Sequence, residues 1–262
     1  MPRPIDRVGI ASLKRPIVVR DQARGWQHAV ADITMSVDLP ARFKGTHMSR
    51  FVEALEAWGD RVDYHGFRHL LEDLSQRLDA SRSHLAFSFP YFMALAAPVS
   101  GSRALMDCQC RLSGTLGRNG FTMTLGVEVP VMTVCPCSLA ISSVGAHSQR
   151  ALVNMLVTFS GFLWIEDLAA IGRESASSPV FALLKREDEK KITESAFDHP
   201  CFVEDVVRAA AQRLEAHPLV KTYRVEVESL ESIHNHNAFA SIAGPSGNTD
   251  KAPRVPNGPE PL

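Results

Sequence analysis

Alternation between apolar and polar residues is the feature that most constrains the fold of this chain. Within residues 29–39, every second position is apolar, as at Ile33, Met35, Val37 and Leu39. A period of two is typical of a strand that buries one of its faces. Further strand-like runs cover residues 85–91, 104–112, 121–134, 151–159 and 222–230. The chain is therefore expected to be rich in half-buried strands.

Apolar residues at helical spacing lie between some of these runs. Phe51, Leu55 and Trp58 share one face of a predicted helix, and a second apolar stripe runs through residues 67–78. Helical patterns also cover residues 165–171 and 202–214. The order of strands and helices is loosely similar in the two halves of the chain, which predicts an α+β protein and is weak evidence for a duplication.

The charge balance argues against nucleic acid and membranes as partners. The 262 residues include 28 Lys and Arg against 29 Asp and Glu, a formal net charge of −1, so no basic excess is available for phosphate backbones or anionic lipids. The five cysteines are an odd number and include two Cys-X-Cys pairs, which favours reduced thiols. No apolar segment typical of a secretory signal follows the charged N-terminus, and we therefore expect a cytoplasmic protein.

Residues 133–150 contain groups that are suited to metal binding. Cys135 and His147, a thiolate and an imidazole, are a natural ligand pair for zinc or another first-row divalent ion. No further close pair of ligands follows His147 to complete a structural site, so an incomplete set favours a catalytic ion. The alternative is that Cys135 and Cys137 are small core residues and that His147 caps a helix. The remaining cysteines are expected to be structural: Cys108, Cys110 and Cys201.

A second compact polar group follows the last strand-like run. Glu231, His234 and His236 are close in sequence, and two histidines two positions apart face the same side of an extended chain. This group suits binding of a polar heterocycle, proton transfer or metal ligation; the alternative is a solvated strand end. From the residues alone, Glu189 in a charged run and Glu204 in the first turn of a helix are surface carboxylates.

Six short motifs occur in a consistent order along the chain: residues 45–51, 97–101, 134–138, 145–150, 202–205 and 231–236. Together they resemble the GTP cyclohydrolase IB family. The resemblance implies an α+β tunnelling fold (T-fold) with two tandem ββαα-type units, antiparallel sheets and helices on one face. Residues 1–150 would form the first unit, with the Cys/His metal motif, and residues 151–243 the second. Residues 244–262, which are rich in Pro and Gly, are predicted to be a disordered C-terminal tail.

The resemblance also implies a reaction. It is the hydrolysis of GTP to 7,8-dihydroneopterin triphosphate and formate, the first step of tetrahydrofolate biosynthesis and, in many bacteria, of queuosine-type deazapurine biosynthesis. One divalent ion, manganese, iron or zinc, would activate water for attack at guanine C8. Its ligands would be Cys135, which is thereby part of the catalytic group, and His147, with Glu189 as a third.

The same resemblance assigns roles to the other polar residues. Glu204 would bind the guanine edge, since a carboxylate accepts from the ring N–H and the exocyclic amine together. Glu231, His234 and His236 would lie beside the ribose and C8, where the two histidines would bind substrate and transfer protons.

Binding of the triphosphate would require several cations. Four of them lie in or near the motifs: Arg50, Arg103, Arg150 and Lys185. The family implies a homotetramer with sites at subunit interfaces, so these cations would converge from more than one chain. Two other functions stay open, namely a different tunnelling-fold enzyme for pterins or deazapurines, such as a nitrile reducer with a cysteine nucleophile, and a non-catalytic purine-binding metalloprotein.

Overall fold

The computed structural model describes residues 3–245. Its strands are β1 (Ile5–Asp21), β2 (Gly25–Leu39), β3 (Ser83–Ala96), β4 (Arg103–Gly117), β5 (Gly120–Val134), β6 (Ser148–Phe159), β7 (Ser178–Pro179), β8 (Val220–Ser229) and β9 (Ala238–Pro245). Its helices are α1 (Ser49–Trp58), α2 (Tyr64–Arg77), α3 (Pro136–Ile141), α4 (Ile165–Glu174), α5 (Arg186–Asp198) and α6 (Val203–Ala216).

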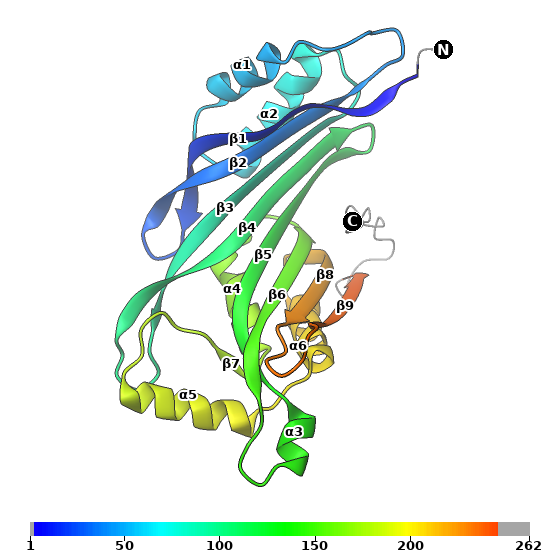
Figure 1. The fold of residues 1–262 in the computed structure, drawn as a ribbon. Helices are drawn as coiled ribbons and strands as arrows, with labels where there is room; N and C mark the ends of the chain where they lie inside the picture. The colour runs from blue at the N-terminus through cyan, green and yellow to red at the C-terminus, as the bar shows by residue number, and fades with distance from the viewer. Residues whose placement is uncertain (1–2, 246–262) are drawn as a thin grey trace.

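The strands form one antiparallel sheet. Its order is β1-β2-β3-β4-β5-β6-β8-β9, and the short β7 pairs with β5 beside this path. In Figure 1 the sheet runs diagonally, with α1 and α2 near one end and α3 and α5 near the other. An α+β chain with an antiparallel sheet, as predicted, is confirmed.

The strand register places the apolar residues of all central strands on one face. The directly paired residues across the sheet are Ile33 and Phe87, Phe87 and Leu112, Leu112 and Leu125, Leu125 and Val157, and Val157 and Tyr223. All of them are buried. Because side chains alternate between the faces of a strand, the opposite face carries the polar residues of the alternating pattern.

The helices cover the apolar face. On one half of the sheet, α2 packs against β3 and β4, and on the other half α4 packs against β5 and β6 while α6 packs against β8 and β9. Both halves include a glycine at a close approach: a Cβ on Gly114 of β4 would lie 2.7 Å from Phe67 of α2, and one on Gly172 of α4 would lie 3.0 Å from Val129 of β5. Helices lie on the same face of the sheet in the two halves.

Three elements differ from the sequence-based expectation. β1 has a weak apolar alternation because it is an edge strand with register irregularities, one of them beside Ser12, whose φ is 58°. β9 consists largely of small, half-exposed residues. α5 lies in the charged run that suggested only a solvated segment, and it buries only Asp188 and Ala196.

The expected division after residue 150 falls inside β6, which pairs with β5 on one side and β8 on the other. The order of two strands, two helices and two strands is complete at the end of β4, so the halves meet between β4 and β5. Of the predicted tail, Gly244 and Pro245 belong to β9, where they pair with Tyr223 and Thr222. Residues 246–262 lie outside the described residues.

Within residues 3–245, none of the helices combines the length and apolar character needed to span a bilayer.

Candidate functional site

A cavity of about 490 Å³ lies where β5 and β8 end and β6 and β9 begin, beside the start of α6. It brings together six of the predicted site residues, which come from segments separated by up to 101 positions in the chain: Cys135, His147, Glu204, Glu231, His234 and His236. The structure therefore joins the two polar groups that the sequence analysis singled out.

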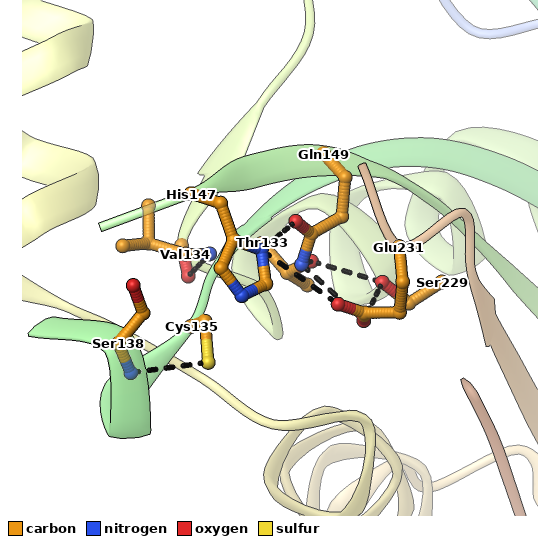
Figure 2. A network of polar contacts seen from close by, with 9 residues as sticks. Thr133, Val134, Cys135, Ser138, His147, Gln149, Ser229 and Glu231 are labelled. Atoms are coloured by element: carbon orange, nitrogen blue, oxygen red, sulfur yellow. Dashed lines mark hydrogen bonds and ion pairs between the residues drawn. The ribbon is translucent and has the colours of Figure 1, made fainter. Parts of the chain in front are cut away.

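Cys135 and His147 are held together by their backbones. The Cys135 amide donates to the His147 carbonyl at 3.1 Å, at the point where the β5–β6 pairing ends. Cys135 is the N-cap of α3, and its Sγ accepts from the Ser138 amide at 3.4 Å (Figure 2). This contact with the first turn of α3 fixes the direction of the thiol. Pro136 favours the start of the helix at this point, because proline suits the first helical position. The prediction that His147 and Cys135 share a site is consistent with this geometry.

A buried polar network connects His147 with Glu231 (Figure 2). His147 Nδ1 lies 2.8 Å from Gln149 Oε1, and Gln149 Nε2 lies 3.3 Å from Glu231 Oε1 and 3.2 Å from Thr133 Oγ1. Ser229 Oγ donates to Glu231 Oε1 at 2.8 Å. Gln149, Thr133 and Ser229 were not singled out from the sequence, since each is an ordinary strand residue whose inward direction depends on the register of β5, β6 and β8.

His234 and His236 lie in the turn after β8 and are exposed. Their rings stack with centroids 5.0 Å apart, and the ring of His234 lies edge-on to that of His147 at 6.3 Å. The His234 amide donates to the Glu231 carbonyl at 3.3 Å. The turn therefore presents two imidazoles at the cavity that Cys135 and His147 also line, although the spacing argument assumed an extended chain.

The start of α6 forms another wall of the cavity. Glu204 lies in the first turn of this helix and is exposed at the cavity. Cys201, just before the helix, also lines the cavity, and its amide donates to the Val134 carbonyl. Burial, together with the nearby Asp205, raises the pKa of the Cys201 thiol. This favours a neutral, structural Cys201 over a reactive thiolate.

Two predicted site residues do not line this cavity. Glu189 is an exposed residue in the first turn of α5. Arg50 is an exposed residue of α1, on the other half of the sheet, where it donates to the Arg77 carbonyl at 2.6 Å. The other cations proposed for the triphosphate also lie outside its lining: Arg103, Arg150 and Lys185.

The position of Glu189 is set by its neighbour Asp188. The carboxylate of Asp188 is buried and accepts from the amides of Val99, Ser100 and Lys185 and from the Ser100 hydroxyl. Burial raises the pKa of Asp188, but these hydrogen bonds outweigh it and hold the pKa well below its usual range. They attach α5 to the β3–β4 connection and leave Glu189 pointing away from the core.

Cys108 and Cys110 behave as expected, whereas the alternative that Cys137 is a small core residue is wrong. Cys108 and Cys110 are buried in the apolar core on β4, and the Cys108 contact together with burial raises the pKa of Cys110. Cys137 is exposed on α3. Among the cysteines, Cys135 is thus the one that combines cavity access with an adjacent imidazole.

The donor set fits part of a divalent-ion site. Cys135 and His147 supply one sulfur and one nitrogen, which suit a first-row ion. Across residues 3–245, however, no three Cys, His, Asp or Glu side chains are close enough together to hold a metal. This chain therefore places two of the predicted ligands, Cys135 and His147, at one cavity and the third, Glu189, outside it.

Comparison with known proteins identifies relatives over nearly the full length. Residues 1–240 match the family model described as type I GTP cyclohydrolase folE2. A GTP cyclohydrolase FolE2 of Nitratidesulfovibrio vulgaris strain Miyazaki F is 60% identical over 239 residues, which cover 91% of this chain and 92% of the relative. A GTP cyclohydrolase FolE2 of Desulfovibrio desulfuricans is 59% identical over 242 residues, which cover 92% and 93%.

Solved structures with this fold are far more distant in sequence. Uricase from Arthrobacter globiformis aligns with a TM-score of 0.57 at 10% identity, over 95% of this chain and 96% of the uricase. Urate oxidase from Bacillus sp. TB-90 aligns with a TM-score of 0.51 at 8% identity, over 92% and 99%. These likenesses concern the fold alone, and they agree with the tunnelling fold that the motifs imply. On the family model and the identities of its relatives, the chain belongs to the type I GTP cyclohydrolase family, under the name FolE2.

Proposed function

We propose that this protein hydrolyses GTP to 7,8-dihydroneopterin triphosphate and formate, with the guanine bound in the cavity beside Cys135 and His147. Membership of the GTP cyclohydrolase family supports GTP as the substrate. The observation that carries the proposal is the gathering of two thiols, three imidazoles and two carboxylates around one cavity. The product would enter tetrahydrofolate biosynthesis and, where the pathway exists, queuosine-type deazapurine biosynthesis.

Recognition of guanine is assigned to Glu204. Its carboxylate is at the cavity and has two oxygens that accept hydrogen bonds. Guanine presents a ring N–H and an exocyclic amine on one edge, so a single carboxylate binds both groups. Adenine has no donor at the ring position, and this contact therefore selects guanine.

Proton transfer is assigned to His234 and His236. Opening of the imidazole ring at C8 and release of formate require protons to be moved between oxygen and nitrogen atoms. Stacked imidazoles at the cavity rim are placed to donate and accept them, because a neutral imidazole has one nitrogen that donates and one that accepts. Glu231 lies on the same side of the cavity and faces the Ser229 hydroxyl.

A divalent ion, manganese, iron or zinc, would be held by Cys135 and His147. When bound, such an ion activates a water molecule as a nucleophile. Glu189 stays the predicted third ligand, although it lies outside the cavity of this chain. Its contribution requires either another copy of the chain or a movement of α5.

A homotetramer with sites at subunit interfaces is part of the proposal. Apolar residues beside the cavity are exposed, with 65% of Ile233 and 74% of Phe239 accessible, as is common where another chain binds. The proposed phosphate ligand Arg50 lies on the other half of the sheet, so it would reach a cavity only in a neighbouring copy. The described strands β1 and β9 are the two edges of the sheet, and apart from the bridge between Val18 and Arg61 on β1 these edges are available for assembly.

Incubation of the protein with GTP under manganese, iron or zinc tests the activity. Formate and a product that becomes fluorescent on oxidation are expected. Absence of both with all three metals would overturn the proposal. Binding of GTP without turnover would instead favour a non-catalytic purine-binding protein.

Two ligand variants test the site directly. Cys135→Ala and His147→Ala are each expected to lose bound metal and turnover, because each removes one of two neighbouring donors. Metal content and formate release are the measurements. Cys108→Ala is the matched control, since this thiol is buried in the core away from the cavity. Full activity of Cys135→Ala would show that the ligand assignment is wrong.

A second tunnelling-fold reaction is favoured by one feature, the Cys135 thiol that faces the cavity at a helix start. A nitrile reducer would use such a thiol as a nucleophile together with NADPH. Loss of activity on chelation supports the cyclohydrolase, whereas loss on thiol alkylation but not on chelation supports the nitrile reducer.

A further inference from the structure

Gln149 occupies the position between His147 and Glu231. It is 8% exposed, and its amide contacts both of these residues and Thr133. The direct separation of His147 Nδ1 from Glu231 Oε2 is 3.8 Å, too long for a hydrogen bond. Among the described residues, the hydrogen-bonded connection between the imidazole and the carboxylate passes through the Gln149 side chain.

The orientation of the Gln149 amide follows from its partners. An ionised Glu231 carboxylate accepts hydrogen bonds and donates none, so the group that faces it must be the Gln149 NH₂. The Gln149 oxygen then faces His147 Nδ1. The Thr133 and Ser229 hydroxyls complete the arrangement, because Ser229 donates to Glu231 and Thr133 accepts from Gln149.

The Gln149 oxygen determines the tautomer of the His147 ring. An amide oxygen only accepts, so the proton of the neutral imidazole is on Nδ1. The lone pair is then on Nε2, the nitrogen that is free of this network. A metal ligand needs such a lone pair, and a hydrogen bond from the other ring nitrogen fixes the tautomer and the ring direction.

We propose that Gln149 is a positioning residue that transmits the negative charge of Glu231 to His147 and holds this imidazole in the Nδ1–H tautomer, with Nε2 available to the metal. The inference rests on the proposed function, in which His147 is a metal ligand. It gives Glu231 a second task, since this carboxylate orients the amide that orients the ligand.

Cobalt binding provides the test, with Co²⁺ as the probe and the thiolate-to-cobalt charge-transfer band as the signal. Gln149→Leu is expected to bind Co²⁺ about 10–100-fold more weakly than the wild type, with the band itself retained because Cys135 still ligates. Gln27→Leu is the matched control: Gln27 also bridges through both ends of its amide, to Phe92 and Asp21, far from the cavity. Wild-type affinity in Gln149→Leu would overturn the proposal.

Exchange of the side chains at positions 149 and 231 tests which of the two must donate the hydrogen bond between them and which must accept it. Gln149→Glu alone places two carboxylates side by side and is expected to weaken Co²⁺ binding. The double variant Gln149→Glu/Glu231→Gln restores an acceptor for His147 and a donor for residue 149, so its Co²⁺ affinity is expected to recover. If the folded double variant did not recover its Co²⁺ affinity, the proposal that residue 149 connects residue 231 with His147 would be contradicted.

Nitrogen-15 NMR of the histidine rings in the metal-free protein separates this inference from the proposed function. The His147 ring is expected as the Nδ1–H tautomer in the wild type and to leave that tautomer in Gln149→Leu. If the wild type bound no Co²⁺ through a thiolate, the metal site of the proposed function would fail, while the NMR result would still decide the role of Gln149. An Nε2–H tautomer in the wild type would overturn the inference.

Discussion

A single half-buried histidine on the polar face of the sheet shows how strongly individual neighbours set a side chain's protonation. His84 of β3 lies 3.0 Å, through Nδ1, from Thr115 Oγ1 of β4. Burial lowers the pKa of His84 to about 4, and the positive charges of Arg7 and Arg82 add to this effect. Asp38 opposes it only in part. The folded protein thus holds His84 neutral where an unfolded chain would protonate it.

We expect the stability of the fold to decrease as the pH falls from 6.5 towards 4 because of this residue. The pKa of His84 is lowered in the folded state, so the unfolded state binds more protons in that range and is stabilised relative to the folded state. Well above pH 6.5 the ring is neutral in both states and contributes nothing to the pH dependence. The free energy of unfolding is expected to be about 1 kcal/mol lower at pH 5 than at neutral pH, after allowance for solvent screening of a half-buried group.

Urea unfolding at pH 7 and pH 5 measures this effect. His84→Gln keeps a polar side chain without a titrating group, and its free energy of unfolding is expected to fall less between the two pH values. An equal decrease in the wild type and the variant would show that other groups account for the pH dependence.

At this scale the sequence indicates candidate site residues by their chemistry, but not the directions of their side chains. Cys135 and His147 stand out because thiols and imidazoles are rare and ligate metals. Gln149 is chemically unremarkable in a strand, and its role follows only from a register that turns it toward Glu231. Glu189 was predicted as a ligand, and the structure places it on the exposed side of α5.

Elements pack against one another most tightly where the chain has glycine. Gly114 allows β4 to approach α2, since a Cβ at this position would lie 2.7 Å from Phe67 Cε1 and 3.1 Å from Leu71 Cδ1. Both of these side chains are fully buried. Any substitution here must displace core residues rather than solvent.

Gly114→Ala is therefore expected to lower the free energy of unfolding by about 1–3 kcal/mol. Gly45→Ala is the matched control, because nothing lies within 4 Å of a Cβ at Gly45, and its effect is expected to stay within about 0.5 kcal/mol. Urea unfolding of both variants is the measurement. Equal stability of the two variants would contradict the close approach of β4 and α2.

Elements were predictable from sequence where one face is buried and the other is solvated. The alternation in β2 and the apolar stripe of α2 indicate their structure because one side of each element contacts the core. α5 has no such stripe. It is held by the polar contacts of Asp188 with a distant connection, and periodicity carries no information about such contacts.

The arrangement of the whole molecule leaves apolar surface uncovered at one end of the sheet. Ile141 and Val144, in α3 and the segment that follows it, are 89% and 96% exposed. They lie between Cys135 and His147 in the sequence, and α3 projects at the end of the sheet in Figure 1. Contacts with another copy of the chain would bury them and place that copy beside the cavity.

We expect the wild-type protein to be a tetramer by light scattering, and Ile141→Asp/Val144→Asp to lower its native mass. Burying two charges without partners in an interface is unfavourable. Ile141→Val/Val144→Ala, which keeps the surface apolar, is the control and is expected to keep the wild-type mass. Circular dichroism verifies that all three proteins are folded. An unchanged mass in the charged variant would exclude this surface from the interface.

The sequence by itself determined which residues face the core, which segments are strands or helices with one apolar side, and which thiol and imidazoles are candidates for the chemistry. Only the tertiary structure decided that Thr133, Gln149 and Glu231 form one network, and that Glu189 and Arg50 lie outside the cavity of the same chain. The reason is physical. Periodicity reports the burial of a side chain, which is a local property, whereas strand order and register depend on contacts between segments that are far apart in the chain.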